Sequence, residues 1–168
     1  TITVIDTISP EIICPEDIVQ STDSLTCDAF VNVPSPFASD NCEIDSVWNN
    51  ITNTSDASTV YNLGTTEITW YAVDIWGNSS SCQMNVTIYD SIPPMIDCPD
   101  DIVANTDPDS CNAYVTVPPP YAWDNCAVDY VWNHLTGTGD ASGIYAVGST
   151  TIWWYAIDIY GNIDSCFM

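Results

Sequence analysis

The chain has 168 residues, of which 46% are hydrophobic and 23 are Asp or Glu, while Lys and Arg are absent. A formal net charge of -23 repels phosphate backbones and anionic lipids, which excludes nucleic-acid binding, and no apolar run approaches the ~20 residues of a membrane span. The hydrophobic content nevertheless predicts a folded chain, and carboxylates without cationic partners make Ca²⁺ a possible ligand.

The sequence consists of two gapless copies of one unit of 84 residues, since 98 − 14 and 166 − 82 both give that offset between equivalent cysteines. The cysteines fall at Cys14, Cys27, Cys42 and Cys82 and again at Cys98, Cys111, Cys126 and Cys166. The same offset relates Trp48 to Trp132 and Asp74 to Asp158. Because the chain holds two whole periods, residue 1 is the periodic successor of residue 168.

The first predicted element is half a strand. Residues 1–6, TITVID, correspond to the second half of the run CQMNVTIYD at residues 82–90, and the final SCFM corresponds to the segment SCQM. Ile2 and Val4 alternate with polar residues in phase with Val86 and Ile88, as a half-buried strand requires. We therefore predict that residues 1–6 complete the last strand of a preceding repeat unit, with Ile2 and Val4 buried there. The period favours a continuous polypeptide over donation from a separate molecule.

Residues 7–90 and 91–168 are the two predicted domains, and both are expected to be all-β. Short alternating segments such as AFVNV, TEITWYAV and CQMNVTIY are separated by Pro, Gly, Asn and Asp, and no long helical pattern interrupts them. Ile68, Trp70 and Ala72 share the predicted inward face, with Ile152, Trp154 and Ala156 as their counterparts. The last strand of residues 91–168 is expected to be completed by the next segment. The short linker DSIPP places the domains in tandem.

The order of motifs resembles the hyalin repeat, or HYR domain, over nearly the whole chain. The shared motifs are ICP-DI, C-A-V-VP-P-A-DNC, GTTEITWYAVDIWGN and SC-VTI-D, repeated as DCPDDI, CNAYVTVPPPYAWDNC, GSTTIWWYAIDIYGN and SCFM. The resemblance implies two tandem immunoglobulin-like β-sandwiches in an extracellular protein with an adhesion or matrix role rather than catalysis. Such repeats are abundant in large secreted proteins of Bacteroidota-like bacteria and occur in animals, so we expect a long bacterial extracellular repeat protein.

The eight cysteines predict disulfides of an oxidising compartment, because no C-x-x-C pair occurs and the only His, His134, has no counterpart in the first copy. Four cysteines per unit allow three pairings. We favour Cys14 with Cys27 and Cys42 with Cys82, and by the period Cys98 with Cys111 and Cys126 with Cys166. No catalytic motif is present, so the chain is not expected to be an enzyme.

Metal binding and glycosylation are the candidate surface chemistries. Recurring carboxylates suit Ca²⁺, although a turn aspartate can instead cap its own backbone. The candidate ligands are Asp6, Asp40, Asp45 and Asp74, and their counterparts Asp90, Asp124, Asp129 and Asp158. N-x-[ST] motifs place candidate glycans on Asn50, Asn53, Asn78 and Asn85, and Asp-[ST]-apolar motifs place them on Thr7, Ser24, Ser46 and Ser91. The alternative interpretation of Thr7, Ser24, Ser46 and Ser91 is that they are ordinary turn residues without a glycan.

Two functions fit these patterns. The first is a structural subunit of an extracellular filament, in which identical units follow one another head to tail. The second is a cell-surface adhesin segment in which exposed aromatics such as Trp76, Trp123 and Tyr160 bind carbohydrate or protein. No cofactor is required for either function.

Overall fold

The computed structural model describes all residues 1–168 and contains fifteen β-strands and no helix. The chain divides into two compact units: unit 1 comprises residues 1–23 and 27–89, and unit 2 comprises residues 24–26 and 90–168. Each unit follows one copy of the 84-residue period, so the prediction of two tandem all-β domains is confirmed. No element is a helix of the length and apolarity needed to cross a membrane.

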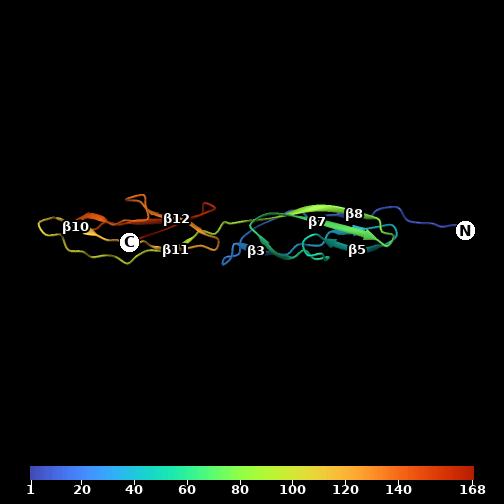
Figure 1. The fold of residues 1–168 in the computed structure, drawn as a ribbon, viewed down its shortest axis with the longest axis horizontal. Coiled ribbons are helices and arrows are strands. Elements are labelled where there is room, and N and C mark those ends of the chain that lie inside the picture. The colour runs from blue at the N-terminus through green and yellow to red at the C-terminus, as the bar shows by residue number, and fades with distance from the viewer. The chain divides into compact units, whose positions relative to one another are not determined.

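Unit 1 contains eight strands, arranged around one core (Figure 1). They are β1 (Glu11–Ile13), β2 (Ile18–Ser21), β3 (Asp28–Val31), β4 (Phe37–Ser39), β5 (Ile44–Asn49), β6 (Thr59–Asn62), β7 (Gly64–Asp74) and β8 (Ser79–Tyr89). The largest sheet has the order β2-β8-β7-β5, in which β2 runs parallel to β8 and the other pairs are antiparallel. Antiparallel β3-β6 and β1-β4 form two smaller sheets.

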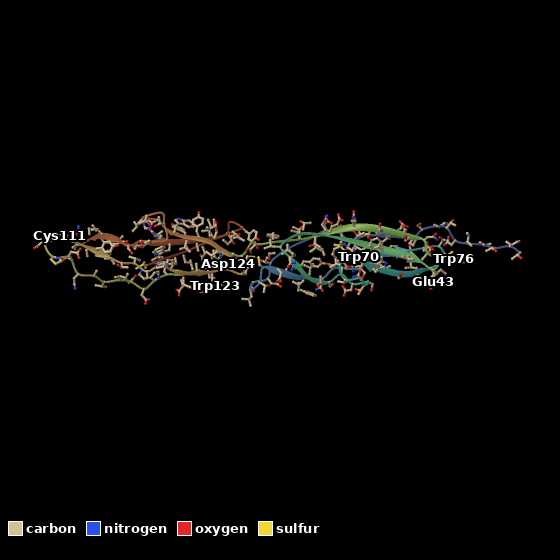
Figure 2. All side chains as sticks on the ribbon, viewed as in Figure 1. Glu43, Trp70, Trp76, Cys111, Trp123 and Asp124 are labelled. Carbon is tan, nitrogen blue, oxygen red and sulfur yellow. A yellow bond between two sulfur atoms is a disulfide. The ribbon has the colours of Figure 1, made fainter.

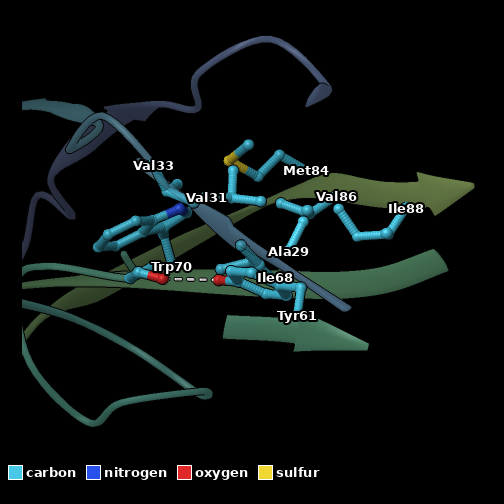
Figure 3. Close-up of a cluster of buried hydrophobic side chains, with 10 residues drawn as sticks. Ala29, Val31, Val33, Tyr61, Ile68, Trp70, Met84, Val86 and Ile88 are labelled. Atoms are coloured by element: carbon cyan, nitrogen blue, oxygen red, sulfur yellow. Dashed lines mark hydrogen bonds between the residues drawn. The ribbon is translucent and has the colours of Figure 1, made fainter. Parts of the chain in front are cut away.

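The core of unit 1 lies between β7 and β8 on one side and β3 and β6 on the other (Figure 3). Alternation places Ile68, Trp70 and Ala72 of β7 inward, and each is 0% exposed, which confirms the predicted inward face. Met84, Val86 and Ile88 of β8 complete this core. The Tyr61 hydroxyl keeps a hydrogen bond inside it, because it donates to the carbonyl oxygen of Ala57 at 2.6 Å.

Unit 2 repeats most of this arrangement with seven strands. They are β9 (Met95–Asp97), β10 (Asn112–Val115), β11 (Tyr121–Trp123), β12 (Val128–Asn133), β13 (Gly143–Ala146), β14 (Trp153–Asp158) and β15 (Ile163–Phe167). The sheets are β12-β14-β15, β10-β13 and β9-β11. Trp154 and Ala156 are 0% exposed and Ile152 is 3% exposed, so the inward face is the same. A counterpart of β2 is the one strand that unit 2 lacks.

Candidate functional site

The two units differ at the edge where their last strands end. In unit 1, the ladder between β7 and β8 continues from the Ile68–Met84 pair through Glu67–Asn85 to Gly64–Ile88. The same half of β8 pairs on its other side with β2, from Ile18–Val86 to Ser21–Tyr89. The second half of β8 is therefore a central strand with neighbours on both sides.

In unit 2 the corresponding ladder stops early. The amides of Ile152 and Met168 donate to each other's carbonyl oxygens at 3.0 and 3.1 Å, which is the last pair of the ladder. Residues 148–151 and 101–105 flank the position where the strand would continue, and all of them are exposed and outside any strand. Neither segment therefore takes part in a ladder.

The edge of unit 2 is hollowed into a groove of about 840 Å³. Its lining includes Ile102, Val115, Tyr145, Ile152 and Met168. Side chains that are buried in unit 1 lie partly open here: Val31 and Tyr61 are 1% and 3% exposed, whereas their counterparts Val115 and Tyr145 are only half-buried. The groove is an opening into the core of the unit.

The first five residues of the chain are an unpaired apolar segment. Ile2 is 92% exposed and Val4 is 83% exposed, and residues 1–9 belong to no strand. Contact with unit 1 begins at Asp6, whose carboxylate accepts a hydrogen bond from the Ile8 amide at 3.0 Å and whose carbonyl oxygen accepts one from Asn78 at 3.3 Å. Residues 1–5 thus do not pack on the unit they precede, and their predicted burial in another unit stays a prediction.

The favoured disulfide pairing is wrong. Cys14 is bonded to Cys82, and Cys98 is bonded to Cys166. These bonds form because Cys14 directly follows β1, which lies beside β8, and the same holds for β9 and β15 in unit 2. Neither Cys14–Cys27 nor Cys42–Cys82 exists, and neither do their counterparts Cys98–Cys111 and Cys126–Cys166.

The prediction that all eight cysteines pair within their own units also fails, because Cys42 and Cys111 are exposed free thiols. Cys27 and Cys126 are disulfide-bonded. Cys111 and Asp124, which precedes Cys126 by two residues, lie at opposite ends of unit 2 (Figure 2). Cys42 donates a hydrogen bond to Asp6, and this bond, together with the nearby carboxylates, raises the pKa of the thiol.

Among the eight predicted metal ligands, the structure brings together two pairs. Asp6 and Asp40 lie with Cys42, and Asp90 and Asp124 lie with Cys126, each set within 4.8 Å. The DNC motif explains part of this geometry, since Asp40 and Asp124 accept hydrogen bonds from the amides of the cysteines two residues later, both at 2.8 Å. Ca²⁺ takes six to eight oxygen ligands, and two partly engaged carboxylates do not supply such a site.

Asp74 and Asp158 cap their own turns. Asp74 accepts hydrogen bonds from the amides of Trp76 and Asn78 at 2.9 and 2.8 Å and from the Asn78 side chain at 2.7 Å, and Asp158 repeats all three bonds. Burial acts to raise the pKa of Asp74, but these hydrogen bonds outweigh it and the pKa is lowered. The same balance lowers the pKa of Asp158. The D-x-x-G-N motif is therefore a capped hairpin turn.

Asp45 and Asp129 are exposed and belong to neither carboxylate cluster. Each lies at a register shift between neighbouring strands, β5 with β7 and β12 with β14. A bulge leaves one residue unpaired, and here that residue is an aspartate facing solvent.

The glycosylation candidates differ in accessibility. Asn50 and Asn53 are exposed, as are Thr7, Ser24 and Ser91. Ser46 lies half-buried in β5. The side-chain nitrogen of Asn78 donates a hydrogen bond to the Asp74 carboxylate at 2.7 Å. The side-chain nitrogen of Asn85 donates one to the Asp17 carboxylate at 3.3 Å. Access alone thus favours Asn50 and Asn53 among the four asparagines.

The exposed aromatics predicted as a binding surface are indeed exposed, with Trp76 at 53%, Trp123 at 42% and Tyr160 at 47% (Figure 2). A second aromatic surface was not predicted. Trp48 stacks on Tyr71 with ring centroids 4.2 Å apart, and in unit 2 Trp132 lies 5.0 Å from Tyr130 and 5.2 Å from Tyr155. Alternation indicates that these rings face outward, but only the cross-strand register shows that they meet.

Two buried asparagines were also missed. Asn49 is 0% exposed and organises the loop after β5, because it accepts hydrogen bonds from the amides of Ile51 and Thr52 at 2.9 Å and donates to the Thr54 carbonyl at 2.8 Å. Asn133 is 0% exposed and makes the same contacts in unit 2. The sequence did contain a signal for this loop, because in both copies an Asn is followed by Thr three and five residues later.

Comparison with known proteins agrees with this architecture. The family model described as "HYR domain" matches residues 5–88 and 89–168. Hyalin of Strongylocentrotus purpuratus is 28% identical over 165 residues, which is 96% of this chain and 13% of hyalin. The "Sushi, von Willebrand factor type A, EGF and pentraxin domain-containing protein 1" of Rattus norvegicus is 28% identical over 166 residues, 96% of this chain and 4% of that protein. The chain thus spans a small part of these relatives.

Solved structures with similar arrangements include protocadherin gamma B7 extracellular cadherin domains 1–4, with a TM-score of 0.47 and 14% identity over 95% of this chain and 48% of that one. Human protocadherin-24 EC1-2 has a TM-score of 0.46 and 11% identity over 96% of this chain and 95% of that one. The disulfides of both units are typical of proteins outside the cell, and the chain is extracellular. With both units matched by the family model, the chain belongs to the HYR domain family, whose modules are of the adhesion type and not enzymes.

Proposed function

We propose that the chain is a structural subunit of an extracellular filament in which identical copies follow one another head to tail. The observation that carries this proposal is that residues 1–5 correspond to residues 85–89 at the 84-residue offset of the repeat. These residues have the alternation of the buried strand at residues 85–89, yet Ile2 and Val4 lie almost fully exposed. An apolar segment in the phase of a core strand is expected to be covered in the assembled protein.

A contact of this kind is heterologous, because the segment at the start of one copy meets a different surface on the next. Heterologous contacts whose rotation does not close produce open filaments rather than rings. The disulfides Cys14–Cys82 and Cys98–Cys166 hold each unit together in an oxidising setting. The filament requires no cofactor.

Negative-stain imaging of the purified chain tests this function. We expect fibres of regular width that lengthen with protein concentration, and we expect a variant lacking residues 1–5 to remain dispersed. That variant removes only exposed residues outside any strand, so its β-rich circular dichroism should not change. Dispersed particles of the full chain at all concentrations would contradict the filament.

The proposed filament carries glycans. Asn50 and Asn53 are exposed in the loop after β5, and Thr7 and Ser91 are exposed near the start of each copy. Sugars at these positions would shield the surface without covering the edge at residues 148–151. Glycopeptide mass spectrometry of protein from its natural source should find modified Asn50 or Asn53 and unmodified Asn78, whose side chain is held by Asp74.

The outward aromatic stacks favour a second candidate function, carbohydrate binding by an adhesin. Tyr130, Trp132 and Tyr155 form an outward-facing aromatic cluster, and the exposed ring of Tyr130 can contact a sugar. Glycan-array binding that is lost in Trp132→Ala and kept in Trp123→Ala would support this candidate. Absence of any glycan binding by the native chain would eliminate it.

A further inference from the structure

We propose that the stacked rings of Trp48 and Tyr71 in unit 1 are a docking surface for the first sugar of an N-linked glycan on Asn50. This inference rests on the glycosylation included in the proposed function and names the surface that receives the sugar. Both rings lie on the outward face of β5 and β7, because the residues that alternate with them, Asn49 and Trp70, are 0% exposed.

The side chain of Asn50 is held at its oxygen and free at its nitrogen. Because Asn49 points inward, alternation turns Asn50 outward, on the same face as Trp48. The Asn50 amide donates to the Thr69 carbonyl oxygen at 3.1 Å, and the Thr69 amide donates to Asn50 Oδ1 at 2.9 Å. Asn50 Nδ2, the atom that carries an N-linked sugar, makes no hydrogen bond. The sheet thus fixes this side chain and leaves its attachment point open.

The other three N-x-[ST] asparagines each lack one part of this arrangement. Asn78 also follows a Trp by two residues, but its Nδ2 donates to the Asp74 carboxylate at 2.7 Å. The Nδ2 of Asn85 is likewise engaged by a carboxylate. Asn53 is exposed, but the residue two positions before it is Ile51. Only the site after β5 therefore combines a free amide nitrogen with an aromatic ring two residues earlier.

The rings present a surface that a sugar can contact. Trp48 and Tyr71 have ring centroids 4.2 Å apart and planes inclined by 19°, and Trp48 is 36% exposed. Because β5 is an edge strand, no strand pairs with it on the side of Trp48 that is turned away from Tyr71. The negative face of an aromatic ring attracts the polarised C–H groups of a sugar. Two residues of strand span about 7 Å, so the first sugar on Asn50 can reach this ring.

Attachment makes a weak contact between sugar and ring intramolecular. The anomeric carbon of the sugar exchanges its bond to the phosphate of a lipid diphosphate donor for a bond to Asn50 Nδ2, the amide loses one proton and the lipid diphosphate leaves. The donor and the transferring enzyme belong to the secreting cell. A sugar tethered two residues from Trp48 meets the ring at an effective concentration far above that of a free sugar. The docked sugar should therefore stabilise folded unit 1.

Unit 2 keeps the stacked rings, as Trp132 and Tyr155 with centroids 5.2 Å apart. It lacks the asparagine, because His134 takes its place. His134 Nδ1 accepts a hydrogen bond from the Trp153 amide at 3.1 Å, which repeats the contact made by the asparagine oxygen in unit 1. Since Thr136 lies two residues later, His134→Asn alone completes an N-x-[ST] motif. Unit 2 thus offers a site into which the arrangement can be transplanted.

The test uses the chain secreted from a eukaryotic cell line that carries out N-glycosylation. Ser55→Ala, Ser80→Ala and Thr87→Ala remove the other three motifs but keep their asparagines, so that Asn50 alone is modified. An endoglycosidase trims the glycan to its first sugar, and the unmodified fraction is the reference. We expect the single sugar to raise the unfolding temperature of unit 1 by about 4 °C or more, because it covers exposed ring surface only in the folded state.

Matched variants locate the contact. Trp48→Val keeps a strand-forming residue in β5 and should abolish the temperature shift, whereas Trp76→Val, at an exposed Trp in a turn, should preserve it. A chain with native Ser55 and Asn50→Gln carries its sugar on Asn53 instead, and it should show no shift because no ring lies two residues before that position.

The transplant and a spectroscopic signature keep the test decisive if Trp48→Val fails to fold. His134→Asn should acquire a sugar that raises the unfolding temperature of unit 2, and Trp132→Val should cancel this gain. In nuclear magnetic resonance spectra, the protons of the sugar on Asn50 should shift upfield, since they lie over a ring face, while those of the sugar on Asn53 should not.

A sugar on Asn50 that changes neither the unfolding temperature nor its own proton shifts overturns the proposal, as does a temperature shift that survives Trp48→Val. A cell line that modifies Asn53 but leaves Asn50 bare also overturns it, because Nδ2 is then not accessible. The proposed glycan of the filament fails separately: glycopeptide mass spectrometry would find Asn50 unmodified in protein from its natural source, while the trimmed glycoform still shows the shift.

Discussion

Units 1 and 2 share a period, a core Trp and a disulfide, yet one is closed and the other is open along one edge. Trp70 and Trp154 are both 0% exposed, so the centre of each core is equally well packed. The difference begins only at Val31 and Tyr61, whose counterparts in unit 2 are half-buried. The comparison teaches which neighbours bury these two side chains in unit 1, where Val31 and Tyr61 share one core cluster with Val86 and Ile88 of β8.

The largest expected difference is in amide exchange. The amides of residues 64–67 lie in the ladder with β8, whereas those of residues 148–151 have no strand partner. Exchange at residues 148–151 should be faster by about a thousandfold or more in the monomeric chain, since exchange through local opening costs little there. Hydrogen exchange measured by mass spectrometry checks this, and equal protection of the two segments would remove the distinction between open and closed units.

Removing the disulfides should act unequally on the two units. A bond across a 68-residue separation contributes about 4 kcal/mol in the chain-entropy account. Cys14→Ser with Cys82→Ser should leave unit 1 folded with a lower midpoint, while Cys98→Ser with Cys166→Ser should abolish the cooperative transition of unit 2. Calorimetry resolves the two transitions. Cys42→Ser with Cys111→Ser is the control and should shift neither, and a similar loss in both units would contradict the comparison.

The loop after β5 and β12 should be equally important in both units. Asn49→Ala leaves the amides of Ile51 and Thr52 without their acceptor, and about 2 kcal/mol of unfolding free energy should be lost. Asn133→Ala should cost the same, because this loop keeps its contacts in both units. Urea unfolding followed by Trp fluorescence measures both values, with exposed Asn32→Ala as the control. A much larger effect in unit 2 would show that its opening extends beyond the edge.

Acid should remove one small contribution equally from both units. The folded-state pKa values of Asp74 and Asp158 are lowered, so their ionised forms stabilise the fold above the ordinary pKa of 3.8, and this stabilisation is lost as the pH falls below that value. Asp74→Asn should therefore be less stable than the native chain at pH 7, with the difference shrinking in acid. Thermal unfolding of both proteins at pH 7 and below pH 3.8 measures this difference, and an equal difference at the two pH values would contradict the prediction.

The fold could be predicted from sequence wherever the evidence is local. Alternation in TEITWYAV determined the inward face of β7, and the gapless period transferred that assignment to β14. The pairing of Cys14 with Cys82 could not be predicted, because it depends on β1 lying beside β8, a contact between distant segments that the spacing of cysteines does not encode.

The candidate site was predicted in part for the same reason. The phase of Ile2 and Val4 indicated a strand without a partner, but the groove at Val115 and Tyr145 appears only when β10 and β13 pair. Asp74 resembled a calcium ligand because a cap and a ligand use the same carboxylate, and only its three local hydrogen bonds distinguish the two roles.

The Cys14–Cys82 bond has a mechanical consequence. When the chain is pulled along its length, tension enters at Cys14, crosses the disulfide to Cys82 and leaves without loading the residues between them. From Cys82 to Cys98 there are 98 − 82 = 16 residue steps, and at Cys98 the next disulfide again diverts the force. An unfolded repeat can therefore lengthen to about 55 Å, against roughly 290 Å for 84 unbridged residues. Oxidised HYR units thus behave under load as nearly inextensible links, and reduction converts the same chain into a long elastic tether.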